Sequence, residues 1–98
     1  MSTESILRKY RSKYVERGSE CLFRPSDAQD FLEDIIAENI DILGIDLWRP
    51  IVTNGTEHLM EDSSVFLTQV DNPHEVARIF LRRHLPPEIT LVSFVLDD

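Results

Sequence analysis

The dipeptide Asn54-Gly55 constrains the fold of this chain most strongly, because it lies between two segments with the composition of β-strands. A two-residue type I′ turn requires positive φ at both central positions, and Asn and Gly adopt that conformation most readily. The preceding segment, 42–53, is rich in Ile, Leu, Val and Trp, which suit a pleated, half-buried surface. The sequence therefore predicts a β-hairpin with arms 42–53 and 56–60.

The best-defined helix is expected to begin at Ser26 and to extend to about Ile40. Ser26 is placed as the N-cap, and Gln29 completes a capping box with it. Apolar side chains then recur with the helical period, which predicts one core-facing stripe. Its members are Ala28, Phe31, Leu32, Ile35, Ile36 and Ile40.

Two further helices are expected on either side of these elements. The first runs from Ser2 or Thr3 to about Val15 and is ended by Gly18, although part of this stretch can instead be extended. The other begins with Asn72 as N-cap and Pro73 at its first position, and ends before Pro86-Pro87.

The remaining apolar segments read as strands or turns. Residues 19–25 form a short strand or a loop, 61–64 turn the chain, and 65–70 make a third strand after the hairpin. The run 89–96 is apolar throughout, which predicts a central strand.

These expectations define an α+β fold with a small mixed, mostly antiparallel sheet of about four strands. Two or three helices would pack mainly on one face of that sheet. The chain has no internal repeat, low-complexity tract or linker, so residues 1–98 are expected to form a single domain.

The net charge of −8 is large for 98 residues and argues against a general nucleic-acid binder, which needs Lys and Arg to neutralise phosphates. The charge is also uneven: residues 18–71 hold twelve Asp and Glu against two Arg. A field of this sign suits a partner with a basic surface, while plain solubility is the alternative explanation.

The acidic segment includes the predicted hairpin, where the only Trp lies among carboxylates. An aromatic anchor beside acidic groups can bind a basic protein surface. The alternative for Trp48 is a place in the core. The candidate partner-binding residues are Asp46, Trp48, Glu57, Glu61 and Asp62.

No pattern in the sequence predicts catalysis, a cofactor or a metal site. The single cysteine, Cys21, excludes an intramolecular disulfide and a multi-cysteine zinc site, and its thiol has no evident activating group. The three histidines lack metal-ligand spacing. With no apolar run of 18 residues and no signal-peptide pattern, we expect a non-enzymatic cytoplasmic protein that does not enter membranes.

Three blocks of the chain resemble a family of bacterial polymorphic-toxin immunity proteins, the immunity protein 40 family. The run from Leu22 to Leu32 resembles that family's W-A-L-T-x-x-x-A-L entry into a helix. The run from Ile42 to Trp48 resembles its I-L-G-G-D-V-Y strand. The segment from Val76 through Pro86 to Leu96 resembles its helix, proline and terminal F-V-L strand.

The blocks follow one another in the family's order over roughly residues 20–96, with three departures. Ile45 replaces the second glycine, Leu22-Phe23 replaces the aromatic entry, and the family's D-N-W-Y segment shortens to Asp71-Asn72-Pro73. The resemblance implies a protein that binds and neutralises a cognate toxin and is not an enzyme. Together with the acidic surface, it leads us to expect a basic, nuclease-type toxin domain as the partner. A regulatory or adaptor domain without toxin neutralisation is the alternative.

Overall fold

The Asn54-Gly55 hairpin is the longest unit of the structure, a computed structural model that describes residues 2–98. Strand β3 spans Asp41–Thr53 and β4 spans Thr56–Phe66, and Thr53 pairs with Thr56 across the turn. Asn54 and Gly55 have φ of 52° and 77°, as a type I′ turn requires. The predicted hairpin is confirmed, and its second arm is longer than expected.

Three more strands complete the sheet: β1 (Tyr14–Arg17), β2 (Glu20–Phe23) and β5 (Leu91–Asp97). The strand order is β1-β2-β5-β3-β4, and each pair of neighbours is antiparallel. The α+β class and the central position of β5 are therefore confirmed. The sheet has five strands where about four were expected, and the additional one is β1.

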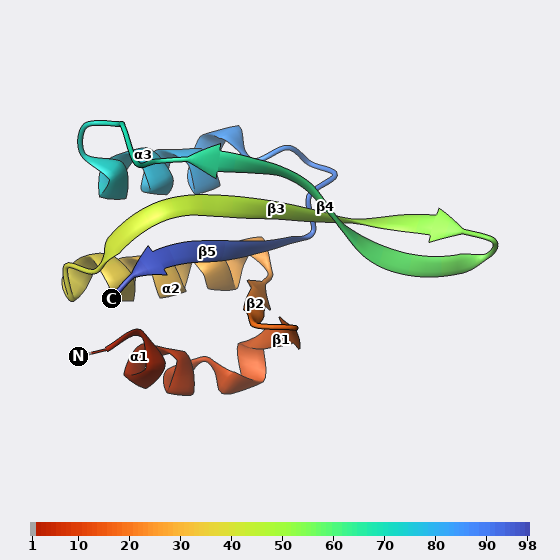
Figure 1. Cartoon of the computed structure of the whole chain (residues 1–98), viewed down its shortest axis with the longest axis horizontal. Coiled ribbons are helices and arrows are strands. Elements are labelled where there is room, and N and C mark those ends of the chain that lie inside the picture. Colours follow the sequence, from red (N-terminus) through yellow and green to blue (C-terminus); the bar gives the residue numbers. More distant parts are fainter. Residues whose placement is uncertain (1) are drawn as a thin grey trace.

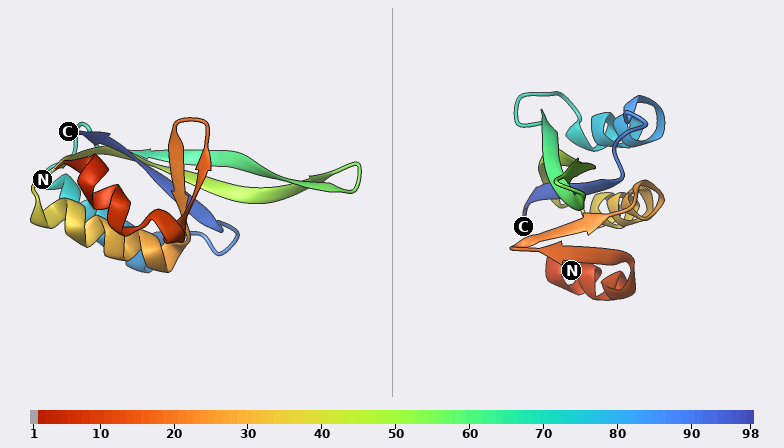
Figure 2. Two further views of the ribbon diagram at one scale, coloured as in Figure 1. Left: turned by 90° about the horizontal axis from the view of Figure 1, so that it is seen from below. Right: turned by 90° about the vertical axis from the view of Figure 1, so that its right-hand side faces the viewer.

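Three α-helices lie on one side of this curled sheet (Figure 2). They are α1 (Thr3–Lys9), α2 (Pro25–Ala37) and α3 (Pro73–Ile79), and α3 continues into a π-helical turn at Phe80–His84. In Figure 1, α2 lies behind β5, α3 lies behind the edge strand β4, and α1 lies beside α2. The other side of the sheet carries no helix of residues 2–98, and we call it the helix-free face.

The main core forms between the helices and the sheet. Phe23 from β2 and Phe31 from α2 stack with ring centroids 4.6 Å apart, and Tyr10 meets Phe31 edge-on at 5.5 Å. The apolar stripe predicted for α2 is confirmed by four fully buried members: Ala28, Phe31, Leu32 and Ile35. This aromatic packing holds α1 and α2 against β2 in one continuous core.

The first helix is shorter than the predicted span to Val15, and the alternative that part of this stretch is extended is confirmed. The helix ends at Lys9, and a 3₁₀ turn at Arg11–Lys13 leads into β1, where Tyr14 pairs with Phe23 and Val15 with Leu22. Pairing with β2 outweighs the local helical period, because aromatic and β-branched residues pack well on a sheet. Gly18 does have a positive φ of 61°, but it serves the turn between β1 and β2.

The turn predicted at residues 61–64 and the separate strand at 65–70 are also wrong. Residues 61–64 continue β4, with Ser64 opposite Asp46 and Ser63 opposite Leu47. The register shifts between Leu47 and Trp48, so Asp62 forms a β-bulge. The bulge accommodates one extra residue of the polar run, and the strand continues past it. The strand ends at Phe66, before the predicted Val70.

The predicted helix starts are correct to within a few residues, and Ser2 caps α1 as predicted, but the capping of α2 and α3 differs. Arg24 is the N-cap of α2 and Pro25 its first residue, because the fixed φ of proline suits that position. Ser26 and Gln29 therefore lie inside the helix. Asn72 is the N-cap of α3, as predicted, but it has a φ of 54° and its side chain makes no capping hydrogen bond.

We expect Phe31→Ala to lower the free energy of unfolding by about 3–5 kcal/mol, because it leaves a cavity among stacked rings. Phe66→Ala is the matched control: Phe66 is 79% exposed, so the same truncation there should change stability by about 0.5 kcal/mol or less. Urea denaturation of both variants measures the difference. Equal losses would contradict this placement of the core.

Candidate binding face of the sheet

The helix-free face contains a second, smaller buried layer around Trp48. Strand pairing places Asp46 and Trp48 of β3 on the same side as Ser64 and Glu61 of β4. Trp48 is only 6% exposed, yet it is not part of the main core. The alternative prediction, that Trp48 is a core residue, is correct in that the side chain is buried. It is buried, however, on the side of the sheet away from the helices and not in the main core.

A chain of hydrogen bonds crosses this face and links four strands. The Trp48 Nε1–H donates to the hydroxyl of Ser93 on β5 over 3.1 Å. Ser93 is also hydrogen bonded to the carboxyl group of Glu20 on β2, which in turn shares a hydrogen bond with Asp46. The Ser64 hydroxyl donates to Asp46 over 2.6 Å. Because Ser93 is fully buried, these partners satisfy a hydroxyl that would otherwise be costly to bury.

Three carboxyl groups, those of Glu20, Asp46 and Glu61, gather in this network, with Arg17 opposite Glu20 across the β1–β2 hairpin. Burial raises the pKa of Glu20, and the hydrogen bond and negative charge of Asp46 and the charge of Glu61 raise it further. No ion pair formed within residues 2–98 includes Glu20, Asp46 or Glu61. The face therefore gathers acidic groups that form no ion pair among the described residues.

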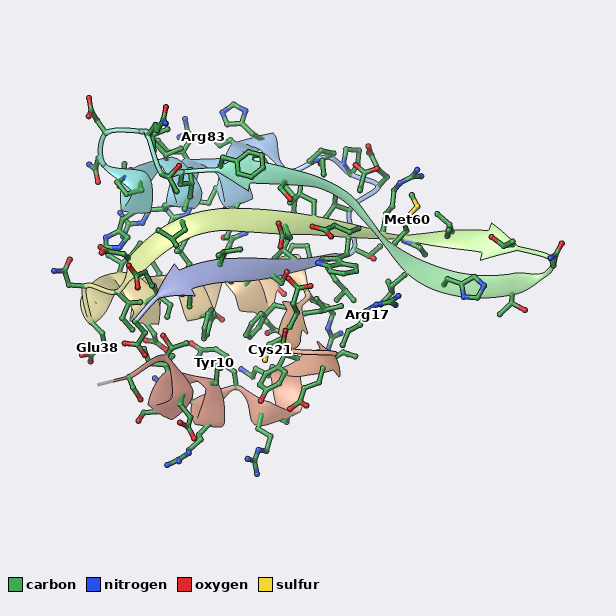
Figure 3. All side chains as sticks on the ribbon, in the orientation of Figure 1. Tyr10, Arg17, Cys21, Glu38, Met60 and Arg83 are labelled. Atoms are coloured by element: carbon green, nitrogen blue, oxygen red, sulfur yellow. The ribbon has the colours of Figure 1, made fainter. Side chains whose placement is uncertain are left out.

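One cation of the chain approaches this face but contacts the ring of Trp48. The guanidinium carbon of Arg17 lies 5.5 Å from the centroid of the Trp48 ring. Figure 3 shows Arg17 beside the base of the Asn54-Gly55 hairpin; it is the last residue of β1 and lies opposite Glu20. This cation–π contact covers the aromatic group while leaving the three carboxylates unpaired.

The structure brings together three of the five predicted binding residues. Asp46, Trp48 and Glu61 are neighbours on the helix-free face. Asp62 is the extra residue of the bulge, and the Nε of Arg49 donates to its carboxylate over 2.9 Å, so its charge is paired. Glu57 lies near the tip of the hairpin, opposite Val52, and is separate from this cluster.

Sequence reasoning missed Glu20 and Ser93. Both come from strands far from the hairpin in the chain, and β5 places Ser93 directly opposite Asp46. A signal was available in Ser93, a polar residue in the middle of an otherwise apolar strand. Glu20 carried no comparable signal, because a carboxylate beside a turn is ordinary at a surface.

A shallow cavity of about 190 Å³ lies on the other side of β2, between α1 and β5, and it is lined by Cys21, Phe23 and Phe94 among others. Burial and the charge of Glu16 raise the pKa of the Cys21 thiol, which keeps it protonated and weakly nucleophilic. No histidine lines this cavity in the described chain. The arrangement supplies no activated nucleophile.

No cluster of His, Cys, Asp or Glu within residues 2–98 is arranged to hold a metal ion. Over the same residues, no helix has the length and apolar character needed to cross a membrane. Comparison with protein-family models, curated proteins and solved structures gave no match to this chain.

We expect Glu20→Gln to raise the melting temperature at pH 7–8. The folded state of the wild type binds the Glu20 proton more tightly than the unfolded state does, so its stability falls as pH rises from about 4.5 towards the raised pKa. The neutral amide removes this loss, and the advantage should vanish near pH 4.5 and below.

The control for this substitution is Glu57→Gln, which removes the same charge from the exposed hairpin. Thermal denaturation between pH 4 and 8 compares both variants with the wild type. A Glu20→Gln variant no more stable than the control at pH 8 would contradict the carboxyl–carboxylate contact.

Proposed function

We propose that this chain is an immunity-type binding protein that neutralises a basic, nuclease-type toxin domain in the cytoplasm by covering its active surface. The observation that supports the proposal best is the group of Glu20, Asp46 and Glu61, three acidic side chains that form no ion pair within residues 2–98 and lie on the helix-free face. The resemblance of residues 20–96 to toxin-immunity proteins agrees with this role.

The negative charge of the helix-free face favours a basic partner and also increases the rate at which that partner associates. A basic surface that approaches the helix-free face supplies the missing cations, and the complementary fields raise the association rate. Catalytic surfaces of nucleases are themselves basic because they bind phosphates, so an acidic protein that covers one also blocks substrate access.

The proposal is tested by affinity capture from lysate of the native source with the tagged chain as bait, followed by elution with a salt gradient. A stoichiometric basic polypeptide that stays bound at moderate salt is expected. Its gene, expressed alone, should arrest growth, and co-expression of this chain should restore it. A bound polypeptide whose expression is harmless would instead support the adaptor function.

Charge reversal at Glu61 should slow association with the captured polypeptide about three- to tenfold at low salt, and it should weaken the salt dependence of the rate. Asp71→Lys is the matched control, because Asp71 is exposed in the loop before α3, away from the helix-free face. Stopped-flow or biosensor kinetics at several salt concentrations measure both. Equal effects of the two reversals would mean that only net charge matters.

A further inference from the structure

The hairpin continues well past the rest of the sheet. Pairing between β3 and β5 ends at Trp48 and Leu91, while β3 and β4 remain paired to Thr53 and Thr56. Residues 49–60, which we call the arm, are therefore a two-stranded ribbon that projects from the body (Figures 1 and 2). The long axis of the molecule reaches 43 Å.

The arm is apolar although it has no core to pack against. Its apolar residues are Pro50, Ile51, Val52, Leu59 and Met60. None of them belongs to the main core or packs against it within the described chain, and Val52 is 70% exposed. Pro50, Ile51, Leu59 and Met60 are half-buried. An isolated two-stranded hairpin is marginally stable in water, so a ribbon whose apolar side chains stay at least partly accessible suits contact with another molecule.

Strand register divides the arm into two sides. Pro50 pairs with Leu59 and Val52 with Glu57, on the same side as the Trp48–Glu61 pair. Pro50, Val52 and Leu59 thus form a strip that continues the helix-free face outwards from its carboxylates. Ile51 and Met60 belong to the opposite side, where Arg49 pairs with Met60.

The charge balance indicates what covers this strip. The arm itself holds one Arg and one Glu and is formally neutral, whereas the whole chain carries −8. A second copy of the chain would bring two acidic bodies together, which like-charge repulsion opposes. A basic protein meets an attractive field at the base of the arm and an apolar surface along it.

We infer that Pro50, Val52 and Leu59 enter an apolar groove that adjoins the basic surface of the partner protein. This inference rests on the proposed function. The carboxylates at the base speed the encounter, and the apolar strip keeps the complex together once water is excluded. The two parts of the surface therefore act on different rate constants.

The test compares two double variants, with the basic polypeptide captured by the wild-type chain as the probe. Val52→Thr with Leu59→Thr removes apolar area from the strip, and Ile51→Thr with Met60→Thr makes the same kind of change on the other side of the arm. Threonine has a high β-propensity, so both variants keep a strand-compatible arm. Circular dichroism and urea denaturation verify that both fold.

The Val52/Leu59 variant should dissociate about tenfold faster or more, with an association rate within about twofold of the wild type and an unchanged salt dependence. The Ile51/Met60 variant should dissociate at nearly the wild-type rate. Equal dissociation by both variants, or wild-type dissociation by the first, would overturn the strip while leaving the proposed function standing.

Two other outcomes are distinguishable from these. If the wild-type chain retains no basic polypeptide at all, the proposed function and the inference both fail. Sedimentation velocity of the free chain tests whether a second copy of the chain binds the strip instead. A wild-type dimer that the Val52/Leu59 substitutions convert to a monomer would show that it does, and would overturn the inference of a basic partner there.

Discussion

The double pairing of β3 is the constraint on which the rest of the molecule depends. This strand lies between β5 and β4, so its register fixes which side chains of the hairpin face the helices and which face away. A slip of one residue would move Trp48 and Asp46 into the apolar layer and expose Leu47 and Ile45. Such an exchange would bury a carboxylate without a partner, and the cost of doing so maintains the register.

The two faces of the sheet are stabilised by different forces. On the helix side, stacked aromatic rings and aliphatic side chains exclude water, and the free energy comes from apolar burial. On the helix-free side, Trp48 is held by a hydrogen bond to a buried serine, and the surrounding carboxylates repel one another. The raised pKa of Glu20 means that ionising this group opposes folding at neutral pH. Retaining three such groups is easier to explain by recognition than by stability.

The sequence was sufficient to predict those features that depend only on residues close together in the chain. The Asn54-Gly55 turn, the apolar stripe of α2 and the proline at the start of α3 each follow from a few adjacent residues, and the structure has all three. The end of α1 and the length of β4 depend on pairing with distant strands. A helical period at Tyr10 and Tyr14, or a polar run at 61–64, carries no information about those partners.

The candidate site also contains residues that the sequence could predict and residues that only the strand order brings in. Asp46, Trp48 and Glu61 were predictable because one hairpin carries all three, and alternation along paired strands places them on one side. Glu20 and Ser93 arrive from β2 and β5, so only the strand order reveals that they complete the network. Asp62 lies apart from these groups because a bulge, which no residue of the sequence predicts, places it against Arg49.

Under the proposed function, the hairpin would combine two roles, attraction of a basic partner and apolar contact with it, that a globular body of this size accommodates poorly. An acidic cluster must stay exposed to attract a basic partner, whereas apolar contact area exposed on the body would compete with the core during folding. The arm separates them, because none of its apolar residues belongs to the main core of the described chain or packs against it. Affinity for a partner can therefore change along residues 50–59 with little effect on the stability of the fold, because the two depend on different contacts.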